Sequence, residues 1–160
     1  MGDLTHFDES GASRMVDVGD KASTIRTARA EAFVLMLPET LRSLRNRGFS
    51  KGDVLEVARL AGIMGAKRTA ELIPLCHAVP LDGVSISFDF PRDGTLRIES
   101  SVRCEWKTGV EMEALTSVSV CALTVYDMCK SADRKMEIQS IRLLEKTGGR
   151  SGHFEREATV

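Results

Sequence analysis

The clearest pattern along the chain is an alternation of apolar and polar residues between positions 84 and 106. One alternating run covers 84–90, a turn with proline and glycine occupies 91–94, and a second alternating run covers 96–106. A period of two is typical of a strand with one buried face. The two runs and the turn between them therefore predict an antiparallel hairpin.

Three segments have the spacing of helices. The segment 38–48 begins with proline, has leucines at helical intervals and ends in glycine. The segment 52–72 has a weaker pattern over its last turns, and Pro74 then stops it. The segment 111–130 is apolar nearly all round, so we expect this helix to be buried on several sides.

Two further segments predict strands, although less simply. The segment 24–34 alternates, but its Ala, Arg and Glu residues favour a helix; we predict a strand. The segment 136–143 alternates with one slip, which indicates a bulge. A glycine-rich tail follows at 147–152. The resulting order is strand, two helices, hairpin, helix, strand, which predicts an α+β sandwich with a mainly antiparallel sheet and helices on one face.

Length and charge narrow the class of protein. The 160 residues suit one domain, 1–160, in which we expect 1–20 and 147–160 to be flexible or ordered by a partner. Lys and Arg number 22 and Asp and Glu 23, a balance that argues against nucleic-acid and polybasic membrane binding. The most apolar stretch, 114–126, is shorter than the roughly 20 residues of a spanning helix. The sequence shows no signal peptide and its four cysteines have no metal or redox spacing, so we expect a cytoplasmic protein without a metal or cofactor.

Ionisable residues gather at the ends of the predicted elements. Lysines near such ends can hold phosphate oxygens, although each one can also be a solvated turn residue. These lysines are Lys51, Lys67, Lys107, Lys130 and Lys146. Asp127 and Lys130 form either an exposed ion pair or a buried acid/base couple, and the pattern leaves both open. His77 is either a structural histidine or a proton-transfer group, whereas Cys76 is more typical of a packing residue.

Longer motifs resemble the cyclic pyranopterin monophosphate synthase family of molybdenum cofactor biosynthesis. The motifs are LTH at 4–6, MVDV at 15–18, KGDV at 51–54, AKRT at 66–69, LIPLCH at 72–77, KTGVEMEALT at 107–116, YDMCK at 126–130 and KTGGRSG at 146–152. The resemblance covers nearly the whole chain. Motifs of this length are far more specific than the short patterns of phosphate or dinucleotide loops, which the chain lacks.

The resemblance implies a ferredoxin-like fold and a lyase without a redox cofactor. Such an enzyme converts (8S)-3′,8-cyclo-7,8-dihydroguanosine 5′-triphosphate into cyclic pyranopterin monophosphate and pyrophosphate. The family also implies a homohexamer, a trimer of dimers with active sites at the dimer interfaces, and a substrate supplied by the radical SAM enzyme of the pathway. The alternative is a non-catalytic regulatory module that binds a purine triphosphate.

The resemblance also implies roles for particular residues. Asp127 is the expected catalytic residue, with Lys51 and Lys130 as further catalytic groups. The expected substrate-binding residues are Leu75, Cys76, His77, Glu111, Met112, Glu113, Lys67, Lys107 and Lys146. A continuous helix separates Glu113 from Asp127 by about 21 Å at 1.5 Å per residue. We therefore expect two subunits to share each active site.

Overall fold

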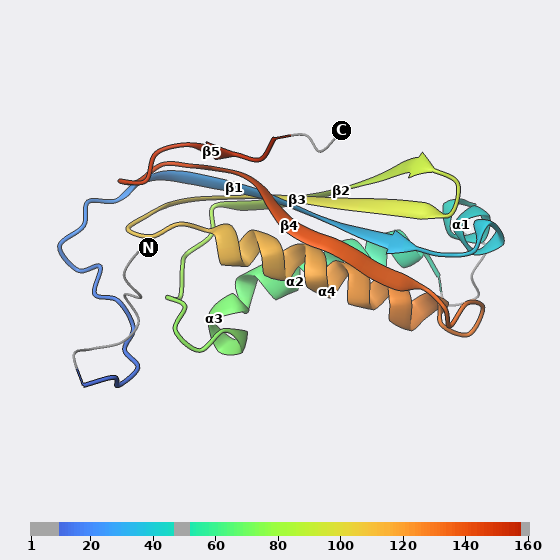
Figure 1. Cartoon of the computed structure of the whole chain (residues 1–160), viewed down its shortest axis with the longest axis horizontal. Coiled ribbons are helices and arrows are strands. Elements are labelled where there is room, and N and C mark those ends of the chain that lie inside the picture. Colours follow the sequence, from blue (N-terminus) through green and yellow to red (C-terminus); the bar gives the residue numbers. More distant parts are fainter. Residues whose placement is uncertain (1–9, 47–51, 158–160) are drawn as a thin grey trace.

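The computed structural model describes residues 10–46 and 52–157 as a five-stranded sheet with helices on one face (Figure 1). The elements, in chain order, are β1 Thr24–Leu35, α1 Pro38–Arg45, α2 Val54–Lys67, α3 Thr69–Leu72, β2 Gly83–Arg92, β3 Thr95–Trp106, α4 Glu111–Cys129, β4 Glu137–Thr147 and β5 Phe154–Glu155. The predicted α+β sandwich is thus confirmed, including the hairpin of β2 and β3.

The order of strands in the sheet is β2-β3-β1-β4-β5, and all paired neighbours are antiparallel. The connection from β1 through α2 leads to β2, and β3 lies between these two strands. In the same way, the connection from β3 through α4 leads to β4, and β1 lies between them. Two such split β-α-β units make the ferredoxin-like arrangement that the family resemblance implies.

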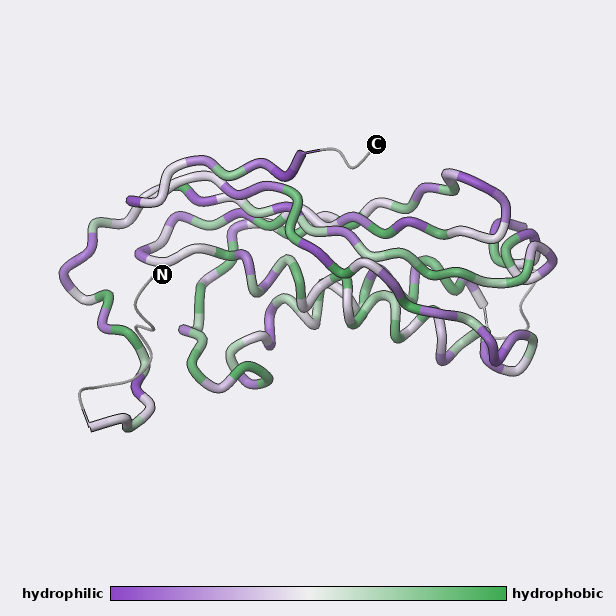
Figure 2. The backbone as a smooth tube through the Cα atoms, viewed as in Figure 1, coloured by the Kyte–Doolittle hydropathy of each residue, from purple (hydrophilic) through white to green (hydrophobic). Residues whose placement is uncertain are grey.

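Strand β1 forms because its alternation outweighs the helix preference of its residue types. Ala28, Ala30 and Ala32 are buried against the helices. On the opposite face, the carboxylate of Glu31 accepts hydrogen bonds from Arg97 at 2.6 Å and from Arg142 at 2.7 Å. Figure 2 shows this change between hydrophilic and hydrophobic residues along the strands. One face of the sheet is therefore apolar and the other carries ion pairs.

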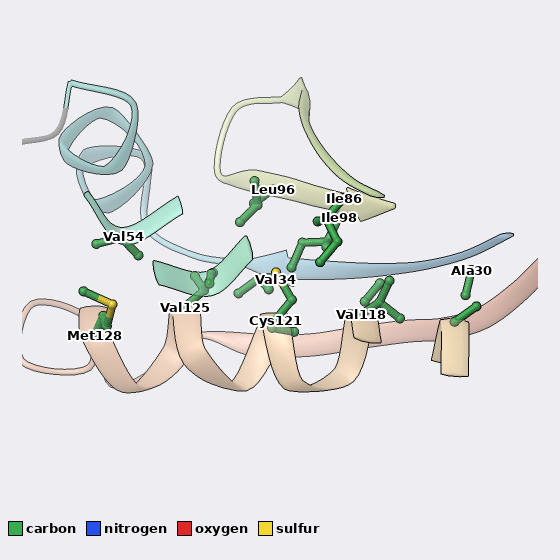
Figure 3. Packing of buried hydrophobic residues seen from close by; sticks show 14 of the residues in the cluster. Ala30, Val34, Val54, Ile86, Leu96, Ile98, Val118, Cys121, Val125 and Met128 are labelled. Carbon is green, nitrogen blue, oxygen red and sulfur yellow. The ribbon is translucent and has the colours of Figure 1, made fainter. Parts of the chain in front are cut away.

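Helix α4 lies along the middle of the apolar face, and its burial confirms the prediction for 111–130. Val118, Cys121 and Val125 are fully buried and point toward β1 and β3, where Val34 and Ile98 face them (Figure 3). Burial of such side chains stabilises the fold by about 25 cal/mol for each Å² of apolar surface removed from water. One side of the centre of α4 is therefore fixed in the core.

The helical layer is tight because glycines of α2 face α4. A Cβ atom at Gly62 would lie 2.5 Å from Cδ1 of Ile86 and 3.0 Å from the carbonyl oxygen of Ser117. A Cβ atom at Gly65 would lie 2.9 Å from Cγ2 of Val120. The two glycines thus mark the close packing of α2 against its neighbours.

The element boundaries differ from the sequence prediction in three places. The first helix ends at Arg45, and its predicted end at Gly48 lies outside the described residues. The helix predicted over 52–72 is divided near its weakly patterned end. Helix α2 ends at Lys67, and α3 begins at Thr69.

The third difference is the end of the sheet. Strand β4 extends to Thr147 and contains the predicted bulge, seen as shifts in its pairing with β1 and a positive φ at Ser140. The two residues of β5, too short for an alternating pattern, pair with β4. Among the described helices, none is both long enough and apolar enough to cross a membrane.

Enlarging Gly62 should destabilise the fold. We expect Gly62→Val to lower the free energy of unfolding by about 1–3 kcal/mol, the usual cost of overpacking a tight core. Met64→Val, on the exposed side of the same helix, is the matched control and should change stability by less than about 0.5 kcal/mol. Urea unfolding of both variants measures this; equal stabilities would show that α2 and α4 are not closely packed at Gly62.

Candidate active site

The first turn of α4 lies beside a cavity of about 270 Å³, which we call the His77 cavity. Three segments that are distant in sequence line it: the N-terminal segment, the loop after α3 and the start of α4. Figure 1 shows these three segments at the same end of the molecule. The lining residues are Val16, Val18, Lys21, Leu75, Cys76, His77, Val79, Thr108, Gly109, Glu111, Met112 and Glu113. Six predicted substrate-binding residues, Leu75, Cys76, His77, Glu111, Met112 and Glu113, are thus brought together here.

Local sequence explains how the cavity forms. Pro74 follows α3, and the N–H of Cys76 donates to the carbonyl of Ile73, so the chain turns sharply before His77. Gly109 precedes α4, and a side chain there would collide with the carboxylate of Glu111. The absence of a Cβ atom at Gly109 therefore leaves room for the carboxylate of Glu111 to fold back over the start of the helix.

Glu113 is the most buried ionisable group in the cavity wall, with 4% of its surface exposed. Burial raises its pKa from the ordinary 4.5 to about 7; a hydrogen bond from its own backbone amide opposes this rise, and the charge of Glu111 adds to it. A carboxyl group with this pKa can accept or donate a proton near neutral pH. A carboxylate in the first turn of a helix also suits the helix dipole, but the burial of Glu113 and its raised pKa are typical of a functional group.

The thiol of Cys76 has a different character. Burial, and to a smaller extent the charge of Glu113, raises the pKa of Cys76 above its ordinary 9.0. A thiol with a raised pKa is a poor nucleophile at neutral pH. This agrees with the interpretation of Cys76 as a packing residue that lines the cavity.

A second cavity, of about 680 Å³, adjoins the first; we call it the Arg26 cavity. Lys21, Thr108, Gly109 and Glu111 line both cavities. The cations around the second one are Lys21, Arg26, Lys107 and Arg150, against the acids Asp20 and Glu111. This excess of positive charge suits an anionic ligand such as a phosphate chain.

Two hydrogen bonds to backbone carbonyls hold the side chain of Arg26 in the lining of this cavity. Its Nε donates to the carbonyl of Trp106 at 2.9 Å, and its Nη2 donates to that of Lys107 at 3.2 Å. Gly148 and Gly149 have φ angles of 92° and 72°, and a Cβ atom at Gly149 would collide with the guanidinium of Arg26. The glycine-rich tail therefore passes directly over Arg26 and brings Arg150 to the cavity.

The remaining predicted lysines lie in several places. Lys107 lines the Arg26 cavity, and its Nζ donates to the carbonyl of Gly19 at 2.5 Å. Lys146 donates to Oγ of Ser151, a residue that lines the same cavity. Lys67 lines a separate, mostly apolar hollow, which shares only Val79 with the His77 cavity.

Lys51 lies outside the described residues. Within the described ranges, no group of three or more His, Cys, Asp or Glu side chains is arranged to hold a metal ion.

Asp127 and Lys130 lie at the other end of α4, away from both cavities of the same chain. Their Oδ1 and Nζ atoms are 2.5 Å apart, and 66% of the Asp127 side chain and 52% of the Lys130 side chain are exposed. In the single chain the couple is an exposed ion pair. Because α4 is unbroken from Glu111 to Cys129, the couple cannot reach Glu113 within one subunit.

Sequence reasoning missed Lys21, Arg26 and Arg150 as members of the site. The expected phosphate-binding residues are lysines near element ends, whereas Arg26 lies inside a strand and Arg150 in the tail. The tail motif KTGGRSG and the MVDV motif next to Lys21 were the available signals. Neither motif shows which side chain faces a cavity, because that depends on β1 and β4 pairing in the sheet.

Comparisons with known proteins agree with this geometry. A family model described as the MoaC family matches residues 15–149. Similar proteins include three called cyclic pyranopterin monophosphate synthase. They come from Magnetococcus marinus (59% identical, covering 99% of this chain and 98% of the relative), Desulfitobacterium hafniense (56%, 97% and 95%) and Methylobacterium nodulans (60%, 98% and 99%).

The raised pKa of Glu113 predicts a pH-dependent stability. Between about pH 4.5 and pH 7 the folded chain holds a proton on Glu113 that the unfolded chain has lost, so stability falls as the pH rises. In Glu113→Gln this contribution disappears. Relative to wild type, the variant should gain up to about 1.4 kcal/mol for each pH unit across that window.

Urea unfolding at several pH values measures this difference, with Glu71→Gln on the exposed surface of α3 as the control. Curves for Glu113→Gln and wild type that run parallel from pH 4.5 to pH 7 would contradict the assignment of a raised pKa.

Proposed function

The chain belongs to the MoaC family, and we infer that it is a cyclic pyranopterin monophosphate synthase of molybdenum cofactor, or molybdopterin, biosynthesis. It is a lyase that converts (8S)-3′,8-cyclo-7,8-dihydroguanosine 5′-triphosphate into cyclic pyranopterin monophosphate and pyrophosphate. The observation that carries this inference is that the two cavities adjoin, because Lys21, Thr108, Gly109 and Glu111 line both. One of them contains the buried carboxyl group of Glu113, and the other is lined by cations.

The two cavities suit the two halves of this substrate. The His77 cavity combines the apolar side chains of Leu75 and Met112 with the polar groups of His77 and Glu113, as expected of a pocket for a fused ring system. The Arg26 cavity offers the phosphate chain one rigidly held guanidinium and the ammonium groups of its lysines. We place the base-derived rings in the first cavity and the triphosphate in the second.

The reaction needs proton transfers and a stabilised leaving group. Opening the purine-derived ring and closing the pyranopterin both require a group that can give and take protons near neutral pH, and Glu113 meets this requirement. Closing the cyclic phosphate expels pyrophosphate, whose growing negative charge the cations of the Arg26 cavity would stabilise. Lys107 and Lys146 lie close enough to this cavity to take part.

We propose that the Asp127–Lys130 couple, together with Lys51, completes the site of a neighbouring subunit. In a two-fold dimer with antiparallel α4 helices, the end of one helix comes close to the start of the other. Large apolar side chains such as Leu60 and Leu123, exposed by 61% and 58%, lie on the helical layer and are available for such a contact. The same proposal extends to a homohexamer, a trimer of dimers.

The cellular setting follows from the pathway. We propose a cytoplasmic enzyme that receives its substrate from the radical SAM enzyme of molybdenum cofactor biosynthesis.

Lys67, in its separate hollow beside Val79, stays a proposed substrate-binding residue, because the hollow adjoins the His77 cavity.

Purified protein should release pyrophosphate from the cyclic dihydro-GTP intermediate without a redox cofactor. The reaction is measured in two ways: chromatography detects the pterin product, and a coupled assay detects pyrophosphate. Tight binding of the intermediate by folded protein with no pyrophosphate release would instead identify a regulatory module that binds a purine triphosphate.

The exposed couple on α4 should matter for turnover and hardly for folding. We expect Asp127→Asn and Lys130→Ala to lower kcat by about 100-fold or more, the scale of lost acid–base catalysis. Their free energies of unfolding should change by at most about 1 kcal/mol, because exposed ion pairs contribute little. Glu56→Gln removes a comparable exposed pair, with Arg59 on α2, and is the control for both measurements. Near-normal kcat in both α4 variants would reduce the couple to a surface ion pair.

A further inference from the structure

The N-terminal residues 15–21, which we call the strap, are tied to two side chains of the site. The carbonyl oxygen of Val16 lies 2.7 Å from Nε2 of His77, and the carbonyl oxygen of Gly19 accepts the hydrogen bond from Lys107. The strap also has turns of its own, since the N–H of Lys21 donates to the carbonyl of Val18. Figure 1 shows this segment at the same end of the molecule as the start of α4.

The hydrogen bond to Val16 determines where the proton of His77 lies. A backbone carbonyl oxygen can only accept, so Nε2 must carry the hydrogen. The opposite tautomer would place the lone pair of Nε2 against the lone pairs of the oxygen at 2.7 Å, which is repulsive. In the neutral ring Nδ1 then holds the lone pair, and among the described residues no hydrogen bond engages that nitrogen.

We infer that the strap is the positioning element of His77: the Val16 carbonyl fixes the proton on Nε2 and leaves Nδ1 as the nitrogen that exchanges a proton with the substrate. This inference deepens the proposed function and rests on it for the role of His77. The strap also closes one side of the pocket, because the side chains of Val16 and Val18 line the His77 cavity. Val16 thus acts on the reaction through His77 and through the shape of the pocket.

The tautomer is measured directly by nitrogen NMR of the full chain with ¹⁵N-labelled histidine, at a pH where the ring signals are those of a neutral imidazole. The signals of His77 are those that vanish in His77→Gln, and His153→Gln serves as the control for assignment. We expect the hydrogen on Nε2. A hydrogen on Nδ1 would overturn the inference.

Two variants of His77 separate the two nitrogens. The side-chain amide nitrogen of glutamine lies near the position of Nε2 and can donate to Val16, whereas the shorter asparagine places its nitrogen near Nδ1. Hydrogen exchange of the Lys21 amide reports whether the strap stays in place. We expect near-wild-type exchange in His77→Gln and about tenfold faster exchange in His77→Asn, the scale of one lost hydrogen bond.

Turnover distinguishes a chemical role of His77 from a purely structural one. Both variants lack a basic Nδ1, so both should lose about 100-fold in kcat even though His77→Gln keeps the strap. Recovery of kcat in His77→Gln, or equal exchange in the two variants, would overturn the inference. The NMR and hydrogen-exchange measurements need no turnover. A failure of this inference can therefore be distinguished from a failure of the proposed function, which is tested by pyrophosphate release from the wild-type chain.

Discussion

Helix α4 is a continuous rod whose middle is fixed in the core, and the rest of the site depends on this constraint. The centre of α4 packs against the sheet through Val118, Cys121 and Val125, and Gly62 allows α2 to pack closely beside α4. The helix can neither bend nor slide without losing this packing. The proposed functional groups at its two ends are therefore held at fixed positions, and no single chain can bring them together.

The start of α4 becomes a site because four other segments converge on it. The loop after α3 brings His77, β1 brings Arg26, the tail brings Arg150 and the strap brings Lys21. The packing of these segments buries Glu113 in the first turn of the helix, and this burial moves the pKa of its carboxyl group into the neutral range. The same packing that stabilises the fold thus creates the candidate acid–base group beside a cationic pocket.

The sequence predicted the elements well where periodicity carries the information. The hairpin, α4 and the bulged β4 follow from their patterns, and the strand at 24–34 follows from alternation despite its alanines. What the sequence could not predict depends on tertiary contacts. The β5 pairing involves two residues, and the cavity positions of Lys21 and Arg26 arise only when distant segments meet. The family motifs indicated Glu113, but only the fold shows that it is buried.

We propose that each active site uses the start of one α4 helix and the end of another. The most direct test of this proposal mixes inactive Asp127→Ala with inactive Glu113→Ala protein under conditions in which exchange of subunits is demonstrated. A shared site predicts recovery toward about one quarter of wild-type activity, because half of the dimers are mixed and each mixed dimer has one intact site of two. No recovery despite demonstrated exchange would contradict the claim and confine the site to a single subunit.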